Sequence, residues 1–451
     1  KGERTMFTKI TLENFRSFDH IELDLTEKGN TAKHLAILYG ENGAGKSNLM
    51  SAFVLLPELT RTMDARAAYE RILAQGAIFQ DENMEKEMRE HIRQRLRDMS
   101  AIIKDYQMAD CENPIIAEYE FNIDGNNGCY RVEFGQDEIL HERLEFVLNR
   151  RRGLYFDCST TGININDSIV EKEQGKEFLT DVKEMAKRYW GKHSLLAILI
   201  YEMKDKSNSF GRDNITENFN VVLNEFRNLS CTVSMGDKSW EGLHAQLKVL
   251  NQPLSGKISL KREHELDQVE AFFSHFFAMY DPSIRCVTYE KEYVGELIYY
   301  KLMEEKYIAN SYRRIEFKRE STGNRQLLRI LCYLLVACMG KTVILDEAEA
   351  NIHDLLFQNL LETIQPMIKG QLIMTTHNTM LMEADFARTA TYILQMNPEF
   401  PWDKQIKCIT DYKKRTYATN NIRNKYLNRE YGGVPELKST ELRELLEKMC
   451  E

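Results

Sequence analysis

The sequence predicts an α/β fold of the P-loop NTPase class, with a mixed sheet flanked by helices and a helical insertion. Three features predict it. The segment from Gly40 to Ser47 fits the phosphate-loop pattern G-x-x-x-x-G-K-[ST]. An apolar strand over 342–345 ends in Asp346-Glu347, and a second apolar strand over 372–375 is followed closely by His377. Loop, acids and histidine in this order are typical of a nucleotide-binding protein.

The phosphate loop has the expected context. Residues 35–39 form an apolar run typical of a buried strand, and residues 48–55 begin a helix. Glycines let the backbone aim successive N–H groups at phosphate oxygens, and the following helix adds its positive end. Lys46 can reach the β- and γ-phosphates of ATP, while Ser47 can bind Mg²⁺. The predicted ATP-binding residues of the loop are Gly40, Asn42, Gly43, Ala44, Gly45, Lys46, Ser47 and Asn48.

Composition restricts the class of protein. The 451 residues allow two lobes or one lobe with large insertions, and the net charge of −9 excludes a surface that binds polyanions everywhere. The nine cysteines form no C-x-x-C pair, which argues against a zinc ribbon and fits a reducing compartment. The longest apolar run, 327–339, contains Arg329 and is too short to span a bilayer. With no apolar signal-peptide core at the N-terminus, we expect a cytoplasmic protein without a membrane partner.

Hydrophobic patterns divide the chain into six parts. Two alternating runs, 7–12 and 21–25, predict antiparallel strands ahead of the loop, and runs at 117–121 and 130–134 predict a hairpin with a further strand near 144–148. The expected parts are the first half of the ATPase head (1–60), a helical insertion (61–110), a β-rich part of the head (111–158), a helical or mixed insertion acting as a lid or partner surface (159–310), the second half of the head (311–400) and a C-terminal tail (401–451).

Within the later parts, helical patterns occur near 175–190, 215–228 and 263–280, followed by an apolar helix over 327–339 and a helix over 356–368. No catalytic motif is apparent between 160 and 300.

The predicted catalytic residues follow the apolar strands. We expect the strand of Asp346 to lie beside the loop strand, so that Asp346 holds Mg²⁺ and Glu347 orients the attacking water. His377 can contact the γ-phosphate, and Lys46 completes the predicted catalytic set. Alone, two acids after a strand are often solvated, and a loop histidine is often only hydrogen-bonded. The order of the motifs favours the functional interpretation.

Together with the motif E-N-F-R-S-F at 13–18, these residues resemble an ABC-type ATPase head of the RecF/SMC/OLD branch. In that family a signature motif precedes the Asp-Glu strand by one helix. Ser321 and Gly323 match it, whereas Asn324-Arg325 replace its usual Gly-Gln. The resemblance implies a homodimer or higher homo-oligomer of heads paired head to tail. Each ATP would be sandwiched between one phosphate loop and the partner's Ser321–Gly323 segment.

The resemblance also implies that Arg16 approaches the nucleotide from the N-terminal lobe; a surface salt bridge is the competing interpretation of this arginine. The family's Q-loop glutamine should precede the strand at Ile115, but residues 113–116 contain none.

The motif set, together with 421–428 and 432–435, is similar to that of bacterial anti-phage ATPases such as RloA and the ATPase of the PARIS system. This similarity implies an ATP-hydrolysing sensor that gates a separate effector. The 74 residues after His377 are too few for the nuclease domain of OLD proteins, so we expect a nuclease on another protein. A RecF-like or SMC-like repair ATPase that binds DNA is the alternative, and the basic residues of the tail allow a DNA contact or only a solvated surface. A transporter subunit is disfavoured by the loose signature match.

Overall fold

A seven-stranded sheet forms the centre of the computed structural model, which describes residues 5–27, 31–64, 66–67, 97–148, 150–171, 173–206, 214–236, 238–397, 399–400, 402–412, 421–434 and 439–450. Its strands run in the order β10 (Lys238–Gly242), β9 (Ser230–Met235), β15 (Thr342–Leu345), β16 (Gln371–Thr375), β3 (Leu35–Gly40), β17 (Thr391–Met396) and β18 (Lys404–Cys408). The five inner strands are parallel and the two edge strands are antiparallel to their neighbours.

The three middle strands, β15, β16 and β3, are largely apolar, as expected where both faces of a sheet are covered. Every residue of β3, β15 and β16 is buried. Side chains of a strand alternate between faces, so Ala36 and Leu38 join one hydrophobic core while Leu35, Ile37 and Tyr39 join the other. Continuous apolar runs of this kind are typical of parallel sheets between two layers.

The sequence predicts that the strand carrying Asp346 lies directly beside the loop strand. In the structure these two strands are not neighbours. β16 lies between them and pairs in parallel with both β15 and β3. Since the carboxyl ends of parallel strands meet at one edge, the two motifs still face the same edge of the sheet. The separation by one strand is bridged by backbone hydrogen bonds from Thr376 N to Leu38 O (3.2 Å) and from Ala348 N to Thr375 O (3.2 Å).

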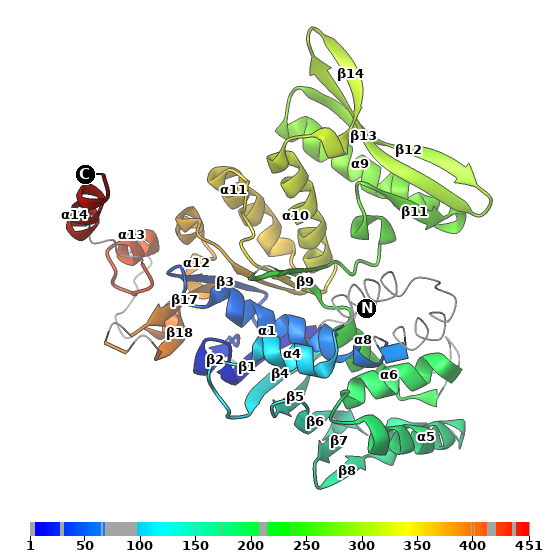
Figure 1. Ribbon diagram of the computed structural model, residues 1–451. Coiled ribbons are helices and arrows are strands. Elements are labelled where there is room, and N and C mark those ends of the chain that lie inside the picture. The colour runs from blue at the N-terminus through cyan, green and yellow to red at the C-terminus, as the bar shows by residue number, and fades with distance from the viewer. Residues whose placement is uncertain are drawn as a thin grey trace, which may run out of the picture.

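A second, antiparallel sheet packs below the centre (Figure 1). Its strands run in the order β2 (Phe18–Asp24), β1 (Thr5–Phe15), β4 (Ile115–Ile123), β5 (Asn126–Phe134), β6 (Ile139–Leu148), β7 (Arg151–Ser159) and β8 (Gly162–Ile165). The predicted strand pair around residue 16 and the predicted hairpin are both present.

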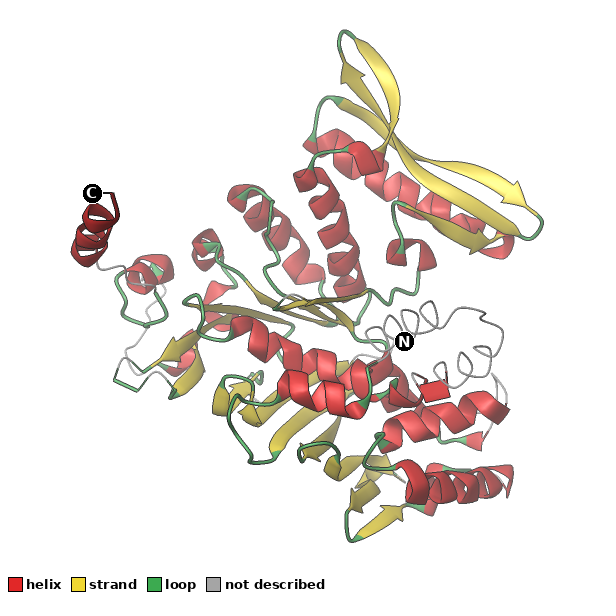
Figure 2. Cartoon of the chain, viewed as in Figure 1, coloured by secondary structure: helices red, strands yellow, loops and turns green. Residues whose placement is uncertain are grey.

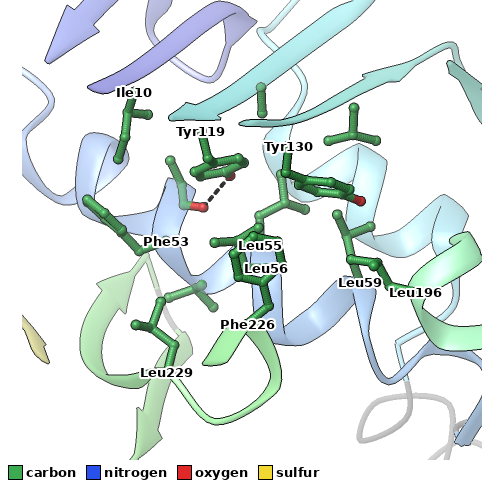
Figure 3. Close-up of a cluster of buried hydrophobic side chains, with 14 of the residues drawn as sticks. Ile10, Phe53, Leu55, Leu56, Leu59, Tyr119, Tyr130, Leu196, Phe226 and Leu229 are labelled. Carbon is green, nitrogen blue, oxygen red and sulfur yellow. Dashed lines mark hydrogen bonds between the residues drawn. The ribbon is translucent and has the colours of Figure 1, made fainter. Parts of the chain in front are cut away.

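Helix α1 (Lys46–Leu59) fills the space between the two sheets. Phe53 meets Phe7 of β1 edge to face, with ring centroids 5.1 Å apart. The Tyr119 hydroxyl of β4 donates to the Ala52 carbonyl oxygen at 2.5 Å, as Figure 3 shows among the surrounding leucines. The helix that follows the phosphate loop is therefore fixed from both sides.

The opposite face of the central sheet is covered by α10 (Thr322–Cys338) and α11 (Asp354–Ile364), which Figure 2 shows in red above the yellow strands. Beyond α10 lies a separate antiparallel sheet of β11 (Ser255–Ser259), β13 (Leu297–Ile308), β12 (Ile284–Val294) and β14 (Ser311–Glu316), packed on α9 (Glu263–Tyr280). This subdomain leads directly into Ser321 and α10.

The remaining described helices are α4 (Met99–Tyr106), α5 (Glu173–Tyr189), α6 (Leu195–Lys206), α8 (Glu217–Arg227), α12 (Ala387–Ala390), α13 (Ile422–Leu427) and α14 (Ser439–Cys450). Helix α6 is docked by the buried carboxylate of Glu142, which accepts from Leu195 N at 2.7 Å and from Trp190 Nε1 at 3.0 Å. Burial raises the pKa of Glu142 to about 6. In the part of the chain that the structure describes, no helix is long and apolar enough to cross a membrane.

The C-terminal segment returns to the loop strand. Tyr426 of α13 lies against Tyr39 of β3, with ring centroids 5.8 Å apart, and its hydroxyl donates to Gly433 O at 2.7 Å. The side chain of Arg423 donates to Thr379 Oγ1 at 3.2 Å, just beyond His377. Residues 421–434 thus contact both the loop strand and the segment after β16.

Two expected segments differ from the structure, and a third lies mostly outside the described residues. Most of the helical insertion at 61–110 lies outside the described residues, apart from the ends and α4. The region 159–310 contains the three predicted helices α5, α8 and α9, but it is divided: β9 and β10 join the central sheet, and β11–β13 form the separate subdomain. The helix expected over 356–368 ends at Ile364, since Pro366 in the next turn has no N–H to continue the ladder.

We predict that Gln371→Leu destabilises the fold. This fully buried amide accepts from Phe7 N at 2.8 Å and donates to Phe7 O and Lys33 O, both at 2.9 Å. Loss of the amide leaves these backbone groups buried without partners, so the free energy of unfolding should fall by about 2 kcal/mol or more. Urea denaturation measures the change, with the exposed Gln405→Leu as the control. Equal stability of Gln371→Leu and Gln405→Leu would contradict the inference that the hydrogen bonds of Gln371 stabilise the fold.

Candidate nucleotide-binding site

The phosphate loop connects β3 to α1 through two glycines in the left-handed region, Gly43 at φ +81° and Gly45 at φ +110°. At Gly45 a Cβ would also lie 2.8 Å from Phe18 Cζ and 2.9 Å from Ser17 Oγ. Only glycine satisfies both constraints. Gly45 caps α1 without a side chain, so the first N–H groups of the helix remain available to an anion.

Lys46 is held by the loop itself. Its ammonium donates to Gly40 O at 2.8 Å and to Glu41 O at 3.2 Å. Burial lowers the pKa of Lys46, and the nearby Asp346 and Glu347 oppose that shift. The lysine therefore places a positive charge at the floor of the loop, where a phosphate would displace the carbonyl oxygens as its partners.

Asp346 is fixed at the end of β15. Its Oδ1 accepts from Thr375 Oγ1 at 2.6 Å and its Oδ2 accepts from Ser234 N at 3.3 Å. Thr375 Oγ1 also accepts from Glu347 N at 2.8 Å, so one hydroxyl orients both acids. Sequence reasoning missed Thr375, whose only signal is its position at the end of the second apolar strand.

Glu347 and His377 both project from turns at this edge. Glu347 is exposed and has a positive φ of +50°, a conformation that is uncommon for glutamate and stores backbone strain. His377 is exposed too, and its backbone N–H donates to Glu349 Oε1 at 2.6 Å. Glu349 was not predicted as a site residue.

These groups line one cleft of about 660 Å³. Its lining residues are Glu41, Asn42, Gly43, Gly45, Lys46, Ser47, Asn48, Asp346, Glu347, Glu349, Ala350 and His377. The predicted loop residues, both acids and the histidine are thus brought together, while Gly40 and Ala44 are buried behind the loop. At Gly40 a Cβ would lie 2.7 Å from Leu394 O, so this glycine lets β17 approach closely.

The donor set fits ATP with a divalent cation. Backbone N–H groups, Lys46 and the start of α1 face the phosphates, and the Ser47 hydroxyl with the Asp346 carboxylate offers the oxygen ligands that Mg²⁺ prefers. The four acidic residues that line the cleft, Glu41, Asp346, Glu347 and Glu349, would repel an uncompensated triphosphate, which is a further reason to expect the cation there.

Arg16 does not line the cleft itself but contacts Asn48, which does. Its Nη1 donates to Asn48 Oδ1 at 3.2 Å, and the guanidinium lies over the Tyr106 ring at 5.2 Å. Among the described residues it forms no ion pair with a carboxylate, and burial lowers its pKa. Asn48 in turn donates to Ser17 Oγ at 2.8 Å. Arg16 therefore supports Asn48, which does line the cleft.

Ser321 and Gly323 do not line the cleft. Ser321 is exposed and caps α10 by accepting from Asn324 N at 3.2 Å. A Cβ at Gly323 would lie 3.0 Å from Asn351 O. The signature-like segment is thus an exposed helix N-terminus outside the chain's own phosphate cleft. No glutamine lines the cleft either, so the Q-loop position stays unassigned.

Comparison with known proteins gives the family. A family model described as an AAA ATPase domain (AAA_15) matches residues 6–382. This chain belongs to the AAA_15 ATPase family. The match spans both halves of the head, from β1 to the segment after His377. The family implies ATP binding, and the expected mixed α/β P-loop ATPase fold is confirmed.

Solved ATPase heads are also similar to this AAA ATPase. An Smc head bound to the C-terminal winged-helix domain of ScpA is 14% identical, with 89% of this chain and 97% of that chain covered and a TM-score of 0.45. The SMC head domain from Thermotoga maritima is 13% identical over 89% and 98%, at a TM-score of 0.37. The recombination mediator RecF with ATP is 12% identical over 87% and 98%, at 0.36. No curated protein matches the sequence.

We predict that Lys46→Ala in this AAA ATPase removes ATP binding while the fold survives. The ammonium contacts only two loop carbonyl oxygens, whereas its charge-assisted bonds to phosphate would be worth roughly 100-fold in affinity. Titration with a fluorescent ATP analogue measures binding, and thermal unfolding without nucleotide is the control. Wild-type affinity in the variant would refute the loop assignment.

Proposed function

We propose that this AAA ATPase is an ABC-type ATPase whose heads pair head to tail around ATP and Mg²⁺. The observation that carries the proposal is that the phosphate loop, the acids and His377 share one cleft, whereas Ser321 and Gly323 lie on an exposed helix N-terminus outside it. The start of the 17-residue helix α10 carries a partial positive charge, and of its first N–H groups that of Asn324 is already bonded to Ser321. A second copy would bring this terminus to the γ-phosphate.

Each residue has a definite task in that arrangement. Lys46 and the loop N–H groups would bind the phosphates, and Ser47 with Asp346 would hold Mg²⁺, which would supply positive charge to the phosphates. Glu347, directed into the cleft by Thr375, accepts a proton from the attacking water. His377 contacts the γ-phosphate, and the partner's Ser321–Gly323 segment stabilises the charge that develops on it. Hydrolysis then releases the two heads.

We further propose that the protein is a sensor in bacterial anti-phage defence that gates a separate effector protein, a nuclease. The support is the resemblance of the motif set, including 421–428 and 432–435, to anti-phage ATPases. In the structure Tyr426 of the first segment lies against Tyr39, and Gly433 of the second lies close to Gly40, so the described residues of both segments pack on the head. The alternative is a RecF-like or SMC-like DNA-repair ATPase.

The head-to-tail arrangement predicts complementation between two inactive variants. Ser321→Arg should leave ATP binding to one chain nearly intact but remove ATP-dependent association and hydrolysis. Lys46→Ala should also be inactive, because this variant does not bind ATP at its own phosphate loop although its Ser321–Gly323 segment is intact. A mixed dimer contains one intact loop facing one intact α10 terminus, so ATPase activity should return on mixing. Full activity of Ser321→Arg alone, or no recovery in a mixture shown to form mixed dimers, would contradict the arrangement.

The defence role predicts that cells with this gene and its neighbours resist phage, and that Lys46→Ala removes the resistance. The plating efficiency of a phage panel measures it, and copurification with a neighbouring gene product identifies the effector. No protection, together with tight and salt-sensitive DNA binding by the purified protein, would favour the repair alternative instead.

A further inference from the structure

Glu349 lies in the phosphate cleft but has no task in the proposed reaction. It follows the Asp346-Glu347 pair by two residues, at the edge where β15 and β16 end. Its Oε1 accepts from the backbone N–H of His377 at 2.6 Å. Its Oε2 is buried and has no hydrogen-bond partner among the described residues. Placing a carboxylate oxygen in such surroundings is unfavourable, so Glu349 is not an ordinary solvated acid.

The hydrogen bond from His377 is short and joins two different loops. The neighbours of His377 are held by other groups: Asn378 N donates to Thr376 Oγ1 at 3.0 Å, Tyr39 Oη donates to Asn378 O at 2.9 Å, and Asn378 Nδ2 donates to Asp354 O at 2.9 Å. Among the described residues, the hydrogen-bond partner of the His377 backbone N–H is Glu349 alone. This bond therefore adds to the bonds that Thr375 accepts from Glu347 N and Ala348 N, and it fixes the His377 backbone itself relative to Glu347.

We propose that Glu349 is the positioning residue for His377. By accepting its N–H, the carboxylate holds the histidine over the cleft and ties the loop after β16 to the loop that carries Glu347. The γ-phosphate contact and the proton acceptor are then kept at a fixed separation. This inference rests on the proposed function in assigning His377 to the γ-phosphate; the tie between the two loops stands on the hydrogen bond alone.

The kinetic test compares two variants of the full-length protein. Glu349→Ala removes the acceptor, so kcat for ATP should fall about 10- to 100-fold, as for other groups that orient a functional side chain, with KM changed little. Glu349→Gln keeps an oxygen of the same reach and should recover most of the loss. Glu362→Ala, an exposed acid on α11, is the matched control and should behave as wild type. Equal loss in the Gln and Ala variants would overturn the proposal, because it would make the charge essential, as for a metal ligand or a base.

Hydrogen exchange of the His377 amide tests the same bond without nucleotide. The amide should exchange faster in Glu349→Ala than in wild type and keep its protection in Glu349→Gln, while the Thr376 amide, bonded to Leu38 O, should not change. Unchanged exchange at His377 in Glu349→Ala would overturn the proposal. If the wild-type protein hydrolyses no ATP, the proposed function fails, and exchange alone then decides whether Glu349 positions the loop.

Discussion

The parallel pairing of β16 with both β15 and β3 is the constraint on which the cleft depends. It brings the ends of three strands to one edge, so that the phosphate loop, Asp346 and His377 face one another although about 300 residues separate the loop from the other two. Thr375, at the end of the middle strand, extends the constraint to side chains by orienting Asp346 and the backbone of Glu347. Buried apolar side chains on both faces hold the strands in this order.

The loop is enclosed from two further directions. The N-terminal turn approaches Gly45 through Phe18 and Ser17, closely enough to exclude any side chain there. The C-terminal segment approaches from the other direction, with Tyr426 on Tyr39 and a close approach between Gly433 and Gly40. A change in the conformation of the loop on nucleotide binding would therefore alter its contacts both with the antiparallel sheet and with the C-terminal segment. In the proposed role as a sensor, that connection would carry the nucleotide state from the loop to other surfaces of the head.

The sequence predicts the parts of the site that are local. The phosphate loop, the strands of Asp346 and His377 and helix α10 all have strong apolar patterns beside recognisable motifs. It does not predict β9, a short strand with alternating polar residues that joins the central sheet only through tertiary pairing with β15. Thr375, and the contact of Glu349 with His377, were missed for the same reason, because these roles arise from contacts between neighbouring strand ends. The position of β16 between β15 and β3 likewise depends on strand order, which local patterns do not encode.

The most direct measurement is an experimental structure of Glu347→Gln protein with ATP and Mg²⁺, since loss of the proton acceptor should trap the loaded state. The account predicts two heads related by a two-fold axis, each triphosphate lying on the loop from Gly40 to Ser47, Mg²⁺ beside Ser47 and Asp346, and the partner's Ser321–Gly323 segment at the γ-phosphate. ATP bound to a single chain, with Ser321 facing solvent at saturating nucleotide, would contradict it.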